Sequence, residues 1–234
     1  GDFSSAGSAE FRLLQQVADG RASLALGENG YARATALGSA GPDQRLVYGL
    51  ELQTYDGPWT DIREDVGKVN LMLRQGFDLA GGQANVTVMG YRNRWNSADQ
   101  IPQRAVDQGL IGEFGSIDTT LGGESSRYSL SGGWAGRAFE GDFELRAYAI
   151  DYALDLWSNF TYLLDDPIQG DQFQQVDERQ IYGFIASQQW QSGRSRWRVG
   201  AEGRFDDIGR VALLRTTERR VTGTVRDDAV EQGS

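Results

Sequence analysis

The side chains of this sequence best suited to acid–base chemistry are carboxylates, because it contains neither histidine nor cysteine. Two acidic pairs stand close together, Glu202 with Asp206 and Asp165 with Asp166. General acid–base catalysis needs one carboxyl group held against a second titrating group, and neither spacing positions an acid against a base. Zinc and haem sites usually recruit histidine or cysteine, and catalytic triads usually need histidine. We therefore expect a protein that is not an enzyme and holds no metal or cofactor.

Asp165, Asp166 and Asp171 together offer the oxygen ligands that Ca²⁺ prefers. The same spacing is typical of a charged loop tip, which is the commoner structure, and the sequence favours that interpretation.

Binding is a better use of the polar and aromatic side chains. Tyr91, Asn93 and Trp95 alternate with other residues and so share one face of a strand, and Tyr152 is a candidate to join them. Rings and an amide suit a ligand with rings or sugars. An aromatic girdle or packing against loops explains the same residues equally well.

Arg204 completes the candidate substrate-binding set, as a member of a charged row along residues 194–205 and just beyond. The row indicates either a path for an anionic ligand or docking of a segment that fills an interior, and a solvated wall is the plainer alternative. Its members are Arg196, Arg198, Glu202, Arg204 and Asp206.

Residues 194–205 must form a strand for this row to exist, because successive side chains of a strand point to opposite faces. The other face is then apolar, and residues 179–190 repeat the pattern with aromatic residues at both ends. A membrane β-barrel has this pattern, with one face against lipid and the other in a wet lumen. A soluble antiparallel sheet also alternates, so the argument depends on how often the pattern recurs.

It recurs along the whole chain and predicts about nine complete strands with a tenth beginning near residue 226. Beyond residue 149 the apolar side becomes unclear, which suggests either a bulge near Asp151 or a strand that rises above a membrane. The predicted strands are residues 21–27, 31–37, 45–55, 68–79, 84–95, 127–136, 142–157, 179–190 and 194–205.

The predicted connections alternate in length. Short turns fall near residues 38–44, 80–83, 137–141 and 191–194, and long connections near 56–67, 96–126, 158–178 and 207–226. Short turns at one end and long loops at the other are typical of outer-membrane barrels. The fold class is therefore predicted to be all-β, a transmembrane antiparallel up-and-down β-barrel that is incomplete in this chain.

Composition narrows the function further. The net charge of −10 argues against nucleic acid as a partner, because nucleic acid requires a basic surface. No run approaches the ~18 apolar residues of a membrane helix, and the mean hydropathy is −0.48. Barrel strands are compatible with both facts, since their half-polar alternation averages to a mild hydropathy.

The sequence resembles the TonB-dependent outer-membrane receptors. Residues 1–11 resemble the end of that family's plug domain, and residues 55–59 the top of its third barrel strand. Residues 93–106 resemble the long loop after the fifth strand, and residues 155–162 the region after the seventh. The resemblance runs along the whole chain but covers about half a receptor.

The resemblance implies a plugged barrel of about 22 strands, of which this chain supplies about 9–10. Residues 1–20 would end the plug and residues 21–234 would begin the barrel. It further implies energised uptake of a scarce nutrient, most often a ferric siderophore, across the outer membrane of a Gram-negative bacterium. The expected partners are the siderophore-like ligand, the lipid bilayer and a TonB-type energising complex, which would bind a region before Gly1.

Two alternatives remain at this stage. A passive porin-type channel is disfavoured by the plug-like first residues, and a soluble or surface β-sheet binding protein is the alternative outside membranes. For the receptor, we expect a curved open sheet whose first and last strands have unpaired edges.

Overall fold

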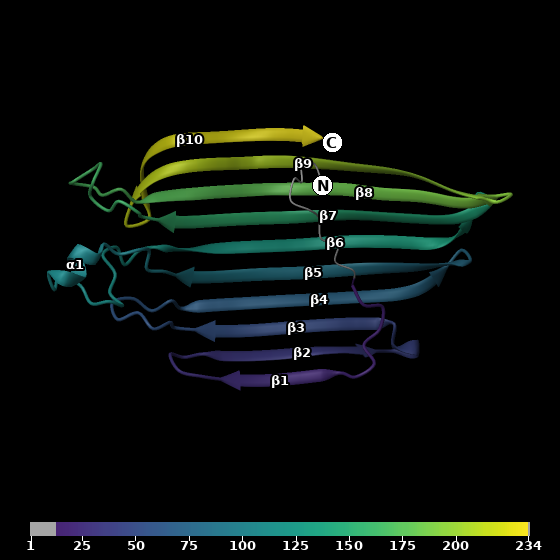
Figure 1. The fold of residues 1–234 in the computed structure, drawn as a ribbon, viewed down its shortest axis with the longest axis horizontal. Helices are drawn as coiled ribbons and strands as arrows, with labels where there is room; N and C mark the ends of the chain where they lie inside the picture. Colours follow the sequence, from purple (N-terminus) through teal and green to yellow (C-terminus); the bar gives the residue numbers. More distant parts are fainter. Residues whose placement is uncertain (1–12, 234) are drawn as a thin grey trace.

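The computed structural model describes residues 13–233, and residues 21–233 form one antiparallel sheet of ten strands in sequence order (Figure 1). The plug-like segment 1–11 lies outside the described residues. Two short helices, η1 (Pro42–Gln44) and α1 (Gln103–Asp107), lie in connections. The strands are β1 (Arg21–Leu26), β2 (Ala32–Ala40), β3 (Leu46–Tyr55), β4 (Val66–Leu79), β5 (Gly82–Asn96), β6 (Gly122–Ala138), β7 (Gly141–Ser158), β8 (Phe173–Ser192), β9 (Ser195–Thr217) and β10 (Arg220–Gly233).

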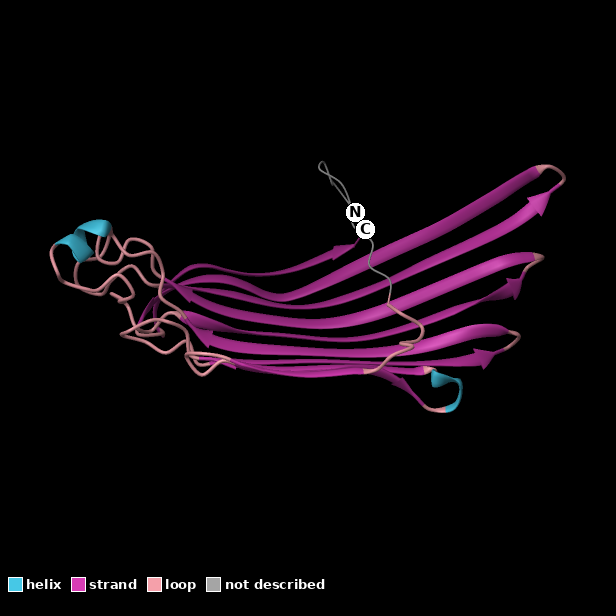
Figure 2. Ribbon diagram, turned by 60° about the horizontal axis from the view of Figure 1, so that its bottom comes forward, coloured by secondary structure: helices cyan, strands magenta, loops and turns pink. Residues whose placement is uncertain are grey.

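The sheet is open. Each strand pairs only with its neighbours in sequence, and β1 and β10 do not pair with each other. Figure 2 shows the strands bent into a trough with a concave and a convex face. The predicted all-β, up-and-down arrangement and the open curved sheet with two edges are therefore confirmed. None of the described helices combines the length and the apolar character needed to cross a membrane.

Connections are sorted by length between the two ends of the trough. One end, here called the turn end, holds residues 41–45, 80–81, 139–140 and 193–194. The other, here called the loop end, holds residues 27–31, 56–65, 97–121, 159–172 and 218–219. All three connections of ten or more residues lie at the loop end, as predicted.

The predicted long connection over residues 207–226 is wrong. β9 continues to Thr217, a tight turn follows at Glu218 and Arg219, and β10 returns from Arg220. Both turn residues have positive φ, 49° and 64°, the backbone conformation of the hairpin turns that favour Asn-Gly. Neither residue is a turn former by type, so the sequence carries no signal for this hairpin. Residues 21–233 thus form ten complete strands rather than nine.

Two other predicted loops are too long, because β6 begins at Gly122 and β8 at Phe173. No bulge occurs at Asp151, since β7 pairs with β6 and β8 in unbroken register. The strand simply extends toward the loop end. A register shift lies instead opposite Glu178 and Arg179, where β9 contains the extra residue Gly209, and three more lie between β9 and β10.

The segment before β1 lies on the concave side. The Val17 backbone N–H donates to Ser39 Oγ at 2.7 Å, and the Gln16 side chain donates to Gln44 at 2.9 Å. Leu13 lies over the concave face, where it lines a hollow shared with Arg74.

Candidate functional site

Three side chains of the concave face, two of them predicted candidates, lie in one cross-strand row. Tyr91 on β5 lies directly opposite Arg127 on β6, and Arg127 lies directly opposite Tyr152 on β7. Side chains directly opposite each other have Cβ atoms about 4.5–5.5 Å apart, so these three are direct neighbours. Arg127 is exposed and the two tyrosines are half-buried. We call these three residues the tyrosine–arginine row.

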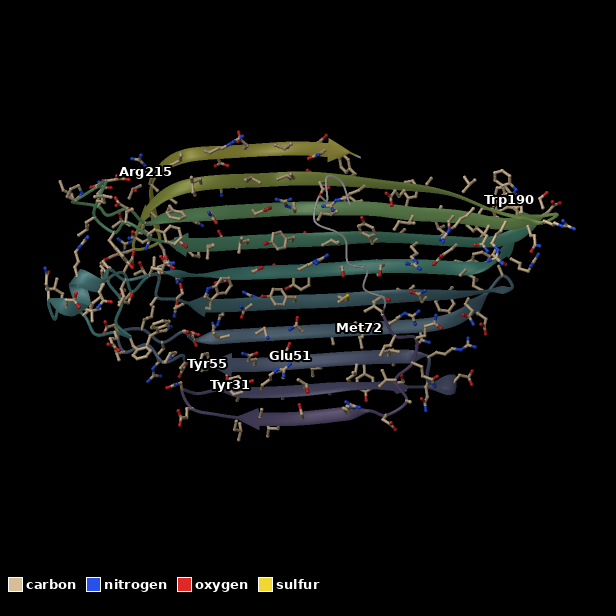
Figure 3. All side chains as sticks on the ribbon, viewed as in Figure 1. Tyr31, Glu51, Tyr55, Met72, Trp190 and Arg215 are labelled. Carbon is tan, nitrogen blue, oxygen red and sulfur yellow. The ribbon has the colours of Figure 1, made fainter. Side chains whose placement is uncertain are left out.

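A hollow of ≈ 1290 Å³ lies against this row. Its floor includes Met72 and Met89, the only two methionines of the chain, which lie directly opposite each other on β4 and β5. Figure 3 shows Met72 in the middle of the sheet, with Tyr31 and Tyr55 nearer the loop end. The hollow therefore combines aromatic, thioether and guanidinium groups on one wall.

A compact ion cluster forms the side of the hollow nearest β1. Glu51 accepts from Arg33 at 2.6 Å, lies 3.2 Å from the Lys68 ammonium and accepts from Asn70 at 2.6 Å. Asn70 lies directly opposite Tyr91, so the cluster continues the tyrosine–arginine row. Glu51 is fully engaged by these donors, and its charge is outweighed by two cations.

The remaining predicted residues lie on other rows. Asn93 is opposite Lys68 and Ser125, one row nearer the loop end, and its Oδ1 is buried without a hydrogen-bond donor among the described residues. Trp95 lies a further row along, opposite Gly123, and its ring occupies the space a side chain there would need. Both point to the concave face, as predicted.

Arg204 does not join the others. It lies on β9 opposite Gly183, and its guanidinium forms a two-pronged ion pair with Asp206 at 2.6 and 2.7 Å. This pair accounts for part of the charged row predicted along β9, and it also engages Asp206, one of the four carboxylates considered for catalysis. Tyr91 and Tyr152 are thus the only two of the five predicted residues that the fold brings to one row.

Arg127 is the residue that sequence reasoning missed. It stood at the predicted start of a strand, where its cross-strand neighbours were undefined. The alternation with Ser129 and Ser131 places it on the polar face, but only the register with β5 and β7 reveals the flanking tyrosines.

At the loop end, Asp118 is the centre of a buried polar cluster. It accepts from Thr120, from Asn159 Nδ2 at 3.0 Å and from Gln172 Nε2 at 2.9 Å. Burial alone would raise the pKa of this carboxyl, but the hydrogen bonds outweigh burial and lower its pKa. The nearby Asp99, which accepts from the Asn159 backbone N–H, has its pKa raised, chiefly by burial.

Arg219 fastens the same cluster to the β9–β10 turn. Its guanidinium donates to the carbonyl oxygens of Thr120 at 2.7 Å and Leu121 at 2.9 Å and to Asn96 Oδ1 at 3.0 Å. It also lies over the Trp157 ring, 4.9 Å from the ring centroid. We call the residues around Asp118 and Arg219 the loop junction. Tyr162 belongs to it, because its hydroxyl donates to the Gln100 carbonyl at 2.6 Å, and burial raises its pKa to about 12.

The acidic loop considered for Ca²⁺ is organised by its own backbone. Asp171 accepts the N–H groups of Leu164, Asp165 and Asp166, and Asp166 accepts those of Ile168 and Gln169. These backbone bonds lower the pKa of Asp166. Within residues 13–233 no group of three acidic side chains is arranged to hold a metal ion.

The convex face carries a continuous band of apolar side chains. Val88 and Leu130 within it are 45% and 54% exposed. Towards the loop end the band gives way to charged residues such as Arg92, Asp151 and Glu178. One row of directly opposed residues from β3 to β9 runs Tyr48, Leu73, Val88, Leu130, Ala149, Tyr182, Phe205.

This band crosses the strands at a slant. Towards the loop end, the band ends at Leu52 on β3 and at Phe205 on β9. Phe205 lies in the same cross-strand row as Tyr48 on β3, which is four residues nearer the turn end than Leu52. Towards the turn end, the band ends at Leu46 on β3 and at Trp197 on β9. Leu46 shares a cross-strand row with Gly203 on β9, and Trp197 lies six residues nearer the turn end than Gly203. At ~3.3 Å per residue and ~4.8 Å per strand, these drifts over six strand spacings correspond to a slant of roughly 25–35°.

Aromatic residues mark both edges of the band. Trp190 and Trp197 lie directly opposite each other at the turn end, where Figure 3 places Trp190. Tyr128 and Tyr182 lie near the other edge and are also exposed.

Comparisons with protein families, with curated proteins and with solved structures find no match to this chain. The resemblance to TonB-dependent receptors therefore stays a prediction from the sequence.

Proposed function

We propose that this chain forms part of the wall of an outer-membrane β-barrel receptor that takes up a scarce nutrient, a ferric siderophore, with energy from a TonB-type complex. The observation that carries the proposal is the slanted apolar band on the convex face. A soluble sheet buries its apolar face, whereas here that face is broad, exposed and edged by aromatic residues.

The slant supports a membrane in particular. Barrel strands tilt against the membrane normal, so a level lipid belt drifts along successive strands. The slant of roughly 25–35° approaches the ~35–45° tilt of outer-membrane barrels. From Trp197 to Phe205 the band covers roughly 26 Å of strand at ~3.3 Å per residue, which the tilt reduces to ~22 Å, close to the ~25 Å apolar belt of such barrels.

The ends and the concave face fit the same proposal. Long connections gather at the loop end, which corresponds to the extracellular side, and two-residue turns dominate the turn end, which corresponds to the periplasm. The concave face is polar and holds the large hollow, as the lumen of a transporter requires. Residues 13–20 run along this face, which suits a plug that fills the lumen.

One pair of neighbouring substitutions tests the membrane assignment. Val88 and Met89 are 45% and 42% exposed but point to opposite faces of β5. Val88→Lys puts a charge into the lipid belt and should cost ~2–4 kcal/mol of folding free energy in a bilayer, whereas Met89→Lys should be tolerated in the lumen. The measurement is the protease-resistant fraction of the whole barrel that contains this chain, after wild type and variants are folded into phosphatidylcholine vesicles.

Equal behaviour of the two lysine variants, or recovery of the folded wild-type chain from extracts without detergent, would refute the membrane proposal and favour a soluble β-sheet binding protein. The transport step is tested by uptake of radioactive iron presented as a siderophore complex to cells that carry the protein. Uptake that a protonophore abolishes supports the energised receptor, and uptake that it leaves unchanged supports a passive channel.

A further inference from the structure

We propose that the tyrosine–arginine row is a subsite for an anionic ligand group attached to a flat ring, held by the Arg127 guanidinium between Tyr91 and Tyr152. This inference names the ligand chemistry of the proposed receptor and rests on that function for its role in transport. Its physical basis is the concave wall itself.

Arg127 has no acidic partner among the described residues, and it lies between two tyrosines. Two arginines of the concave wall are neutralised locally, Arg33 by Glu51 at 2.6 Å and Arg179 by Asp177 at 2.7 Å. Arg127 is not, and within the described part of the chain it shares this property with Arg74 and with Arg21 at the edge of the hollow. The Arg127 side chain forms no ion pair or hydrogen bond with any of residues 13–233. A guanidinium without a carboxylate retains five donors in a fork that matches a carboxylate or similar oxyanion.

The net charge of the hollow is positive, as is the charge of Arg127. Its charged lining consists of Arg21, Arg33 and Arg127 against Glu51, a net charge of +2. The whole chain carries −10, so the positive charge is concentrated where the hollow is. A concave site of one sign raises the local concentration of ligands of the opposite sign.

The neighbours of Arg127 select the shape of the ligand. Tyr91 and Tyr152 lie directly opposite it on both sides, and aromatic faces stack on flat rings and on guanidinium planes. Met72 and Met89 provide a polarisable floor one row away, and thioether sulfur also favours aromatic edges. A ring bearing an oxyanion satisfies all of these groups together.

The test is calorimetric titration of the full chain in a nonionic detergent with naphthalene dicarboxylate as the probe. Naphthalene dicarboxamide removes the charge, and cyclohexane dicarboxylate removes the aromatic ring. We expect naphthalene dicarboxylate to bind more tightly than the other two compounds. Its affinity should fall with added salt, because the site is exposed.

Arg127→Gln should weaken binding by roughly 10- to 100-fold, the range for a hydrogen bond to a charged group. Arg127→Lys keeps the positive charge but loses the forked arrangement of donors, so its affinity should lie between those of the wild type and Arg127→Gln. The matched control is Arg137→Gln, which removes the same charge from the same face of β6 but ~33 Å away at ~3.3 Å per residue. It should bind as the wild type does, and Tyr91→Leu should reduce the preference for naphthalene over cyclohexane about threefold or more.

The inference is overturned if the wild type does not bind the probe at millimolar concentration, if Arg127→Gln binds as tightly as wild type, or if the dicarboxamide binds equally well. Far-UV circular dichroism confirms that each variant retains its sheet. If the chain instead proves soluble without detergent, the receptor proposal fails, but the same titration in buffer still decides the ligand chemistry.

Discussion

Replacing Arg219 with alanine should loosen the loop end of the sheet while leaving the strands in place. The guanidinium makes three hydrogen bonds to residues about a hundred positions away and stacks on Trp157. Each hydrogen bond to a charged donor contributes about 1.5–3 kcal/mol, but bonds made by one group are not additive. With ~0.5–1 kcal/mol from the ring contact, the half-buried site should lose ~3–4 kcal/mol.

The turn geometry refines this estimate. Arg219 has a φ of 64°, and the left-handed conformation costs an L-residue with a side chain ~1–2 kcal/mol. Glycine adopts that conformation without strain. Arg219→Gly therefore loses the same contacts but recovers ~1 kcal/mol, so it should be less damaging than Arg219→Ala.

Amide hydrogen exchange in detergent is the assay. A loss of ~3–4 kcal/mol raises the opening equilibrium roughly 100- to 1000-fold, so exchange in residues 97–121 and 159–172 should accelerate strongly while β3–β5 remain unchanged. Arg220→Ala, at the exposed next position, is the control. Unchanged exchange in both loops after Arg219→Ala would show that other contacts hold the loop end and would refute this reasoning.

Two further predictions concern the loop junction. Asp118→Asn turns an amide donor toward the donors Asn159 and Gln172, so it should destabilise the loops by ~2–3 kcal/mol. Asp99→Asn should instead be neutral or stabilising, because burial disfavours the charge of Asp99. Hydrogen exchange in the loops distinguishes the two variants. Since the folded pKa of Asp118 is lowered, its contribution is present above its ordinary range and lost as pH falls through the folded pKa. Tyr162 has a folded pKa of about 12, so its contribution is lost as pH rises from its ordinary value of about 10 toward 12, and Tyr162→Phe should remove one late step from the ultraviolet titration. An unchanged titration curve would contradict the assignment.

The sequence predicts the face of the sheet on which a side chain lies, but not which residues lie opposite it on the neighbouring strands. Alternation placed Val88 on one face and Tyr91 on the other, and glycines marked turns such as Ala80–Gly81. Register is different, because a shift of two residues keeps every face and changes every neighbour. Tyr91 and Tyr152 became neighbours of Arg127 only through the pairing of β6 with both adjacent strands.

The β9–β10 hairpin was not predicted from the sequence, for a related reason. Hairpin turns of this kind are signalled by Asn-Gly and similar pairs, and Glu218-Arg219 is not such a pair. Its strain is offset by the contacts of Arg219 with Asn96 and Thr120, which lie 123 and 99 positions earlier. A local preference was overridden by contacts that no local pattern contains.

The net charge is misleading about the ligand for a physical reason that the structure supplies. Many of the acidic residues are engaged in holding loops together: Asp118 accepts from three other side chains, and Asp166 and Asp171 cap backbone N–H groups. The concave wall, in contrast, leaves the Arg127 guanidinium without an ion pair among the described residues. Carboxylates thus hold the loop end together, whereas the Arg127 guanidinium remains available for the anionic group that we propose as its ligand. An acidic chain can therefore bind an anion, because the local charge of the hollow, and not the sum over the chain, acts on a ligand at short range.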